Sequence, residues 1–142
     1  MRRSRAKTPM FTRVRLANWR NFAQVDVALQ RRMFLVGPNA SGKSNFLDAF
    51  RFLHDLAAVG GGFQEAIIKR DGVSKLRCLA ARKYSDIVVD VSVGGMNGSP
   101  AWQYELAFNQ DNRSRPFIKS EVVKRNGDVI LKRPNKTDDK DK

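Results

Sequence analysis

In this 142-residue chain, the residue types and spacing that point to a ligand-binding site are found in the octet from Gly37 to Ser44. It matches the phosphate-loop pattern G-x-x-x-x-G-K-[ST] at every fixed position. The two glycines let the main chain approach a ligand closely, so that the loop's N–H groups and a following helix can cradle phosphate. The lysine then supplies positive charge at the β and γ phosphates, and the last hydroxyl can hold Mg²⁺. The octet therefore predicts a site for ATP and Mg²⁺ made of Gly37, Pro38, Asn39, Ala40, Ser41, Gly42, Lys43 and Ser44.

Two neighbouring patterns are expected to position this loop. The unbroken apolar run 33–36, just before it, is typical of a strand that is buried on both faces. After it, apolar residues recur at spacings of three, four and seven between Phe46 and Ala57, which predicts a helix with one broad apolar stripe. The glycine run 60–62 is expected to end that helix, because glycine readily takes the left-handed conformation of a C-terminal cap.

The rest of the chain reads mainly as antiparallel strands. Alternating residues around 14–16 and 25–29 flank a polar turn at 18–21, which predicts a hairpin. A short helix is expected at 63–69. Strand periodicity then returns at 87–93 and 102–108, and in two further segments, 117–124 and 129–132, which flank Asn126 and Gly127. Because both turn positions accept a positive φ, this dipeptide favours a two-residue hairpin turn, and the second half of the chain is predicted to be a meander.

Composition and charge narrow the class of protein. The chain has 27 Lys and Arg against 14 Asp and Glu, a formal charge of +13. Seven of the basic residues precede the first acidic one, Asp26, and such a field favours binding to DNA or another polyanion. A solvated basic leader is the alternative. The expected organisation is a basic unstructured tail at 1–9, a folded domain at 10–132 and a charged unstructured tail at 133–142.

The single cysteine, Cys78, excludes an intramolecular disulfide and a multi-cysteine zinc site, and it points to a reducing compartment. No apolar run approaches the roughly 20 residues that a membrane span requires. We therefore expect a cytoplasmic protein that has no membrane partner.

Two segments, Leu16 to Phe22 and Val36 to Phe50, resemble the N-terminal end of ABC-type ATPases of the SMC, RecF and OLD-nuclease kind. Within that group, the two segments most resemble the stand-alone bacterial AAA-domain ATPases. Trp19 stands where those proteins usually have phenylalanine. The resemblance covers residues 10–60 and extends less closely to 85–132. It implies an α/β fold, a P-loop NTPase of ABC-ATPase type, of which this chain would hold the N-terminal lobe and an antiparallel β-subdomain.

The same resemblance implies an activity, partners and one more site residue. Members bind ATP with Mg²⁺, form homodimers through the nucleotide, and act in DNA repair, recombination or anti-phage defence. In them the turn before the loop lies near the nucleotide, so Arg20 is a candidate phosphate contact as well as a candidate solvated charge.

Other family features are not found in the sequence: the glutamine loop, the signature motif, the Walker B strand with its carboxylate, and the switch histidine. Asp90 imitates a Walker B ending, but Val91 stands where the family has glutamate, and the one-sided alternation around it favours an antiparallel strand. Gln64 follows the loop too closely to be the glutamine of the family. The chain is thus interpreted as the first third of a longer ATPase, and no catalytic residue is assigned.

Four further residues are interpreted as structural. His54 is expected on the flank of the helix, Cys78 as a small buried side chain, and Trp102 with Tyr104 on the core face of a strand. Two alternative functions stay open: a non-catalytic nucleic-acid-binding remnant of such an ATPase, and a small P-loop kinase that uses Asp90 to hold magnesium.

Overall fold

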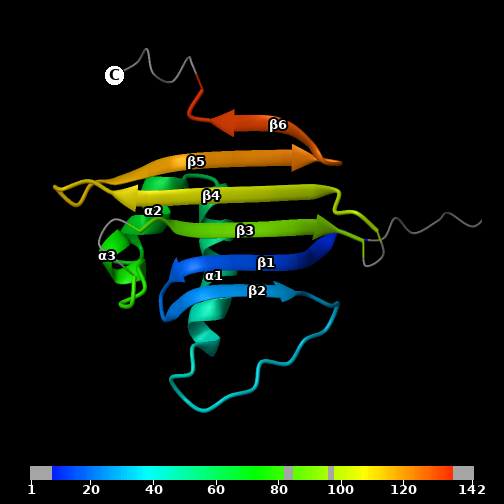
Figure 1. Cartoon of the computed structure of the whole chain (residues 1–142), viewed down its shortest axis with the longest axis horizontal. Helices are drawn as coiled ribbons and strands as arrows, with labels where there is room; N and C mark the ends of the chain where they lie inside the picture. The colour runs from blue at the N-terminus through cyan, green and yellow to red at the C-terminus, as the bar shows by residue number, and fades with distance from the viewer. Residues whose placement is uncertain (1–7, 82–84, 96–97, 136–142) are drawn as a thin grey trace, which may run out of the picture.

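The computed structural model describes residues 8–81, 85–95 and 98–135 as one antiparallel sheet with helices packed on one of its faces (Figure 1). The strand order is β2-β1-β3-β4-β5-β6, and every neighbouring pair is antiparallel. The strands are β1 (Met10–Trp19), β2 (Phe22–Ala28), β3 (Ile87–Gly94), β4 (Trp102–Gln110), β5 (Pro116–Arg125) and β6 (Asp128–Arg133). The helices are α1 (Lys43–Ala57), α2 (Phe63–Ile68) and α3 (Val73–Leu76).

The N-terminal hairpin is confirmed. Val14 of β1 lies opposite Val27 of β2, and Leu16 lies opposite Val25, so the apolar residues of both strands share one face. The turn between them is Arg20 and Asn21, and Arg20 has a φ of 54°. On its other side β1 pairs with β3, which joins the hairpin to the second half of the chain.

The meander is confirmed as well, because β3, β4, β5 and β6 are neighbours in chain order. Its last turn has positive φ at both positions, 49° at Asn126 and 86° at Gly127, as the hairpin pattern predicts. The short helix expected at 63–69 is α2. No parallel strand pair occurs within the described residues, so they form the antiparallel β-subdomain and the loop helix of the expected α/β fold.

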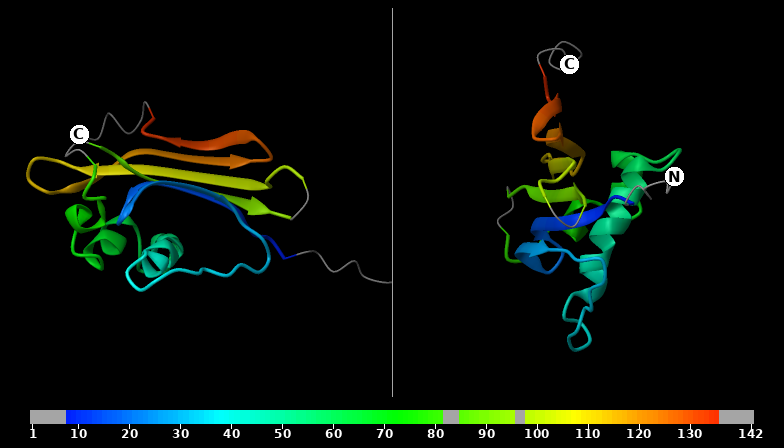
Figure 2. Two further views of the ribbon diagram at one scale, coloured as in Figure 1. Left: turned by 60° about the horizontal axis from the view of Figure 1, so that its bottom comes forward. Right: turned by 90° about the vertical axis from the view of Figure 1, so that its right-hand side faces the viewer.

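The core lies between the sheet and α1, which crosses beneath the strands (Figure 2). Alternating residues of three strands point toward the helix and are buried: Val14, Leu16, Ile87, Val89, Val91, Leu106 and Phe108. From α1, Phe46, Ala49 and Phe52 meet them, and the Phe52 ring stacks on Phe108 with 5.5 Å between ring centroids. Of the predicted apolar stripe, Phe46, Phe50, Leu53 and Leu56 pack on the core, but Leu47 and Ala57 are exposed, because the buried face is centred on Ala49 and Phe52.

The helix ends where predicted, but its cap is different. Ala58 follows the last helical residue in an extended conformation, with φ −65° and ψ 147°. Glycine enters the left-handed region only two residues later, at Gly60 with φ 73°. The turn is instead closed by backbone bonds from Gly61 to Ala58 and from Gly62 to Asp55, so the prediction of a glycine cap was wrong.

The prediction of a buried strand at 33–36 was also wrong. The run belongs to the long connection between β2 and α1, and its side chains are exposed, with Phe34 88% and Val36 91% accessible. Met33 and Leu35 line an apolar groove together with Phe11, Leu47 and Phe50. A strand buried on both faces needs a neighbouring strand and two covering layers, and the described residues supply neither at this place.

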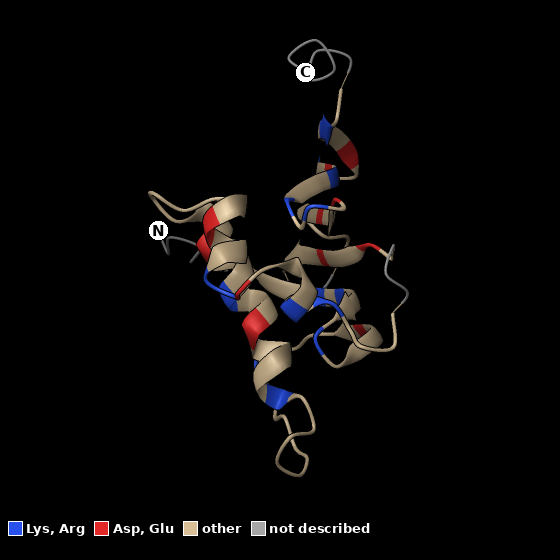
Figure 3. Ribbon diagram, turned by 90° about the vertical axis from the view of Figure 1, so that its left-hand side faces the viewer, with Lys and Arg blue, Asp and Glu red and all other residues tan. Residues whose placement is uncertain are grey.

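Charges of both signs are interspersed on α1 and on the sheet (Figure 3). The basic residues of the first strand are paired: Arg13 with Asp26, and Arg15 with both Asp90 and Glu105. The remaining basic residues at 2–7, and most of the two predicted tails, lie outside the described residues, although Arg133 ends β6. None of the helices in the described part of the chain is long and apolar enough to cross a membrane.

Candidate phosphate-binding site

Residues 37–41 of the octet form an exposed loop, which turns through the buried Gly42 into the first turn of α1. Gly42 is the residue before the helix and has a left-handed conformation, with φ 98° and ψ 8°, and Ala40 has a φ of 65°. The Ser41 N–H donates to the Pro38 carbonyl at 3.2 Å. Among the described residues this is the one backbone hydrogen bond donated from 37–43, so the other loop N–H groups stay available to an anion. No acidic residue lies in the first turn of the helix, so no carboxylate there competes with an anion for the positive end of the helix dipole.

Lys43 reaches back over the loop. Its Nζ donates to the carbonyl oxygen of Gly37 and, at 2.9 Å, to that of Pro38. A Cβ placed on Gly37 would lie 2.7 Å from the Oγ of Ser41, so a larger residue at this position would make the Ser41 side chain move. Ser44 lies at the exposed start of the helix. The geometry thus gathers N–H groups, an ammonium group and a hydroxyl at one surface.

Asn21 lies against this loop, and the sequence interpretation did not assign it to the site. Its Nδ2 donates to the Ser41 carbonyl at 3.4 Å, and its Oδ1 accepts from Nδ2 of Asn45 at 3.0 Å. A Cβ on Gly42 would lie 2.4 Å from the same amide. The asparagine stands in the hairpin turn next to Arg20, and this position was the available signal.

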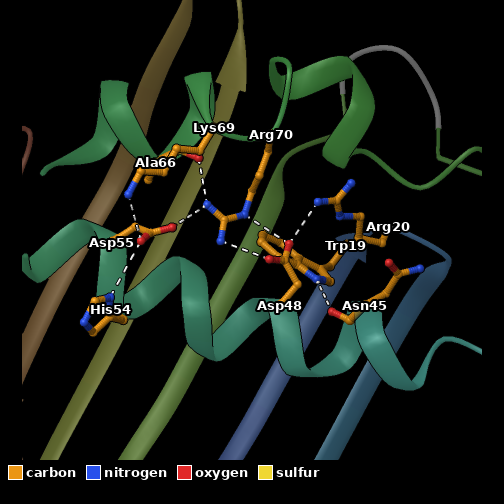
Figure 4. Close-up of polar contacts among 9 residues, drawn as sticks. All are labelled: Trp19, Arg20, Asn45, Asp48, His54, Asp55, Ala66, Lys69 and Arg70. Carbon is orange, nitrogen blue, oxygen red and sulfur yellow. Dashed lines mark hydrogen bonds and ion pairs between the residues drawn. The ribbon is translucent and has the colours of Figure 1, made fainter.

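Arg20 is not a free solvated charge. One of its terminal nitrogens donates to Oδ2 of Asp48 at 2.9 Å (Figure 4). Its Nε is buried without a hydrogen-bond partner in the described part of the chain. The guanidinium is thus held on the helix beside the loop by one ion pair.

Asp48 belongs to a larger charge cluster between α1 and the end of α2. Arg70, whose side chain is 6% exposed, binds both oxygens of Asp48 at 3.0 Å and also donates to Asp55 at 2.9 Å. It lies over the Phe52 ring as well, 5.2 Å from the ring centroid. Lys69 completes the cluster through Asp55 at 3.2 Å.

The pKa values of both carboxyl groups are lowered in this cluster. Burial raises the pKa of Asp48, but hydrogen bonds from Arg70 and Arg20 outweigh that effect and lower it. At Asp55 the hydrogen bond from Arg70 is the main cause of the lowered pKa. Both groups are therefore held as carboxylates.

Tyr104 packs half-buried against the core, but Trp102, at the start of β4, is 42% exposed, so its predicted place in the core was wrong. The other residues interpreted as structural behave as such. Asp90 lies in β3 and pairs with Arg15, and Cys78 is buried. His54 is exposed on α1, and the Gln64 side chain donates to the Pro116 carbonyl at 3.5 Å, on the far side of the helix layer from the loop. The kinase alternative needs Asp90 on a parallel strand beside the loop, and β3 is antiparallel to both of its neighbours.

Comparison with known proteins places the chain in a family. Residues 32–142 match the family described as "AAA domain, putative AbiEii toxin, Type IV TA system". The chain belongs to this AAA-domain family. A further match is 35% identical over 65 residues to the endonuclease GajA of Bacillus cereus (strain VD045), covering 46% of this chain and 11% of that protein. The AAA-domain chain thus spans about a tenth of the length of this relative.

A solved structure shows the same fold. The ATP-bound recombination mediator RecF is similar with a TM-score of 0.52 and 20% identity, over 86% of this chain and 28% of RecF. An SMC ATPase structure gives a TM-score of 0.47 and 19% identity, over 85% of this chain and 72% of the other. The likeness to RecF shows the fold alone, and the family match shows an AAA domain.

Proposed function

We propose that the AAA-domain chain binds Mg²⁺ and ATP at residues 37–44. The observation that carries the proposal is the left-handed Gly42, which turns the exposed loop into the start of α1 while Lys43 covers it. This arrangement supports anion binding, because free N–H groups, a helix start and an ammonium group converge at one place. The residues fit the ligand, since the unbonded N–H groups and the Lys43 ammonium group are donors to phosphate oxygens, and the exposed Ser44 hydroxyl is an oxygen ligand of the kind that Mg²⁺ takes.

Each residue has a distinct role in the proposed site. The backbone N–H groups of the loop bind the α and β phosphates, Lys43 exchanges its two carbonyl partners for β and γ phosphate oxygens, and Ser44 holds Mg²⁺ through its hydroxyl. The ion supplies charge neutralisation at the phosphates when it is bound.

Arg20 is proposed as a further phosphate ligand. If it left Asp48, the carboxylate would keep both of its hydrogen bonds from Arg70 and would remain charge-paired. Asp48 can therefore release Arg20 to a phosphate at a smaller energetic cost than if the carboxylate were left as an unpaired buried charge.

The wider activity follows from the family as a proposal. We infer an ABC-type ATPase that dimerises through bound nucleotide and acts on DNA in repair, recombination or defence. Support comes from the match to RecF and from the formal charge of +13. A nucleic-acid-binding protein without ATPase activity is the second candidate, supported by the ion-pairing of Asp90, the one residue that imitates a Walker B carboxylate.

Equilibrium titration with ATP, in the presence of Mg²⁺ and in EDTA, tests the binding proposal. The wild-type chain should bind more tightly with Mg²⁺, and Ser44→Ala should remove about 1–2 kcal/mol of this difference, or about 5- to 30-fold in Kd. No hydrolysis above background is expected, because no residue of the chain is assigned to position the attacking water. An ATP affinity indifferent to both Mg²⁺ and Ser44 would refute the metal role, and no binding at all would refute the proposed function.

A further inference from the structure

We propose that Asn21 is a positioning residue, which holds the phosphate loop in its left-handed conformation from the turn of the N-terminal hairpin. The functional part of this inference rests on the proposed nucleotide binding, whereas the structural part does not. Asn21 would act through the loop and the helix start rather than by touching the ligand.

Asn21 makes a close contact with Gly42. A Cβ built on this glycine would meet Nδ2, Oδ1 and Cγ of Asn21 at 2.4, 2.7 and 2.9 Å. The planar amide thus lies against the Cα of the residue whose φ of 98° turns the loop into α1. Since glycine has no side chain to restrict it, a neighbour that fills this space limits the conformations that the loop can adopt.

The same amide forms hydrogen bonds on both sides of Gly42. Its donor group reaches the Ser41 carbonyl, one residue before Gly42, and its acceptor binds Asn45 in the first turn of α1. Asn21 therefore links the loop on one side of Gly42 with the helix on the other side. This link spans the residue at which the chain enters the helix.

The hairpin turn that carries Asn21 is held on α1 by Trp19. Trp19, two residues before Asn21, is fully buried, and its Nε1 donates to the backbone carbonyl of Asn45 at 2.8 Å. Its ring also packs on Phe52 of α1, with 5.3 Å between centroids. The hairpin turn and the helix are therefore fixed to each other by the core, and Asn21 extends that fixed frame to an exposed loop.

The exposure of Asn21 distinguishes a role in positioning the loop from a contribution to global stability. Asn21 is exposed, and its hydrogen bonds lie at the surface, where losing one changes global stability little. The effect of removing the amide should instead fall on the loop, since 37–41 are exposed and have few other contacts.

The test compares Asn21→Ala with Gln24→Ala, which removes an exposed amide from the neighbouring strand β2. Hydrogen exchange of the Ser41 and Phe46 amides, whose N–H groups bond to the Pro38 and Gly42 carbonyls, is measured first, without nucleotide. We expect exchange about five- to tenfold faster in Asn21→Ala, no change in Gln24→Ala, and unchanged melting temperatures in both. Titration with Mg²⁺ and ATP should then show a Kd about tenfold higher for Asn21→Ala.

A double-mutant cycle with Asn45→Ala checks the linkage. Because the two amides act as one unit, the double variant should bind Mg²⁺ and ATP within about twofold of Asn21→Ala alone. Unchanged loop exchange in Asn21→Ala overturns the inference, and so does a weaker affinity without faster exchange, which would make Asn21 a direct ligand. If the wild-type chain binds no ATP, the proposed function fails, and the exchange measurement still decides the role of Asn21.

Discussion

Replacing Lys43 with alanine should weaken the binding of Mg²⁺ and ATP about 10- to 150-fold and leave the fold intact. The ammonium group already lies over the loop, on the carbonyls of Gly37 and Pro38, which places it where phosphate oxygens would compete for it. A charge-assisted hydrogen bond contributes about 1.5–3 kcal/mol, and this sets the size of the loss. Isothermal titration of both chains gives the two dissociation constants.

Lys75→Ala is the matched control for this experiment. Lys75 is an exposed lysine in α3, so the variant removes the same charge from another part of the surface. Its affinity should stay within about twofold of wild type, because long-range effects of surface charge are screened by salt. If Lys43→Ala and Lys75→Ala weakened binding equally, the loop would contribute only general positive charge.

Replacing Arg70 with methionine should lower the free energy of unfolding by about 3 kcal/mol. The change removes the buried arginine that Asp48 and Asp55 share. Removing one partner of a buried ion pair leaves the carboxylates with too little positive charge beside them. Methionine keeps much of the packing volume over the Phe52 ring. The loss stays at the lower end of the usual range, because Arg20 still binds Asp48 and Lys69 still binds Asp55. Urea unfolding at neutral pH measures it.

The pH dependence of stability should change in the same variant. In the wild type the pKa values of Asp48 and Asp55 are lower in the folded state than in the unfolded chain. Their contribution is therefore present above the unfolded value of about 3.9 and is lost as the pH falls through the lower folded values. Arg70→Met should reduce this acid-dependent loss, which can be followed by unfolding at a series of pH values between neutral and strongly acidic.

An exposed pair provides the control. Arg115 is 70% exposed and pairs with Asp111 at 2.7 Å, so Arg115→Met removes an arginine from a surface ion pair. Its unfolding midpoint at neutral pH should match that of the wild type. The cluster would have no special role if both variants were equally stable, or if Arg70→Met kept the full acid dependence of the wild type.

The sequence predicted those parts of the fold that depend on local patterns. Val14 and Leu16 alternate with charged residues, and the two-residue turn at Asn126 and Gly127 allows positive φ, so both hairpins could be predicted. The spacing of apolar residues after Phe46 likewise predicted α1 and part of its buried face.

Predictions that needed a neighbour distant in the chain did not all succeed. The run 33–36 is as apolar as a buried strand, but burial depends on other strands and layers, and composition does not show where these lie. The partner of Arg20 could not be predicted either, since Asp48 lies 28 residues further along the chain.

By itself the sequence determined the position of the candidate phosphate loop and the antiparallel character of the sheet, because a fixed motif and side-chain periodicity are properties of short segments. The tertiary structure alone decided that β1 lies beside β3, that Arg70 joins two carboxylates of α1, and that Asn21 lies on Gly42. These contacts arise when the core closes between the sheet and α1, and side chains far apart in the chain meet only then.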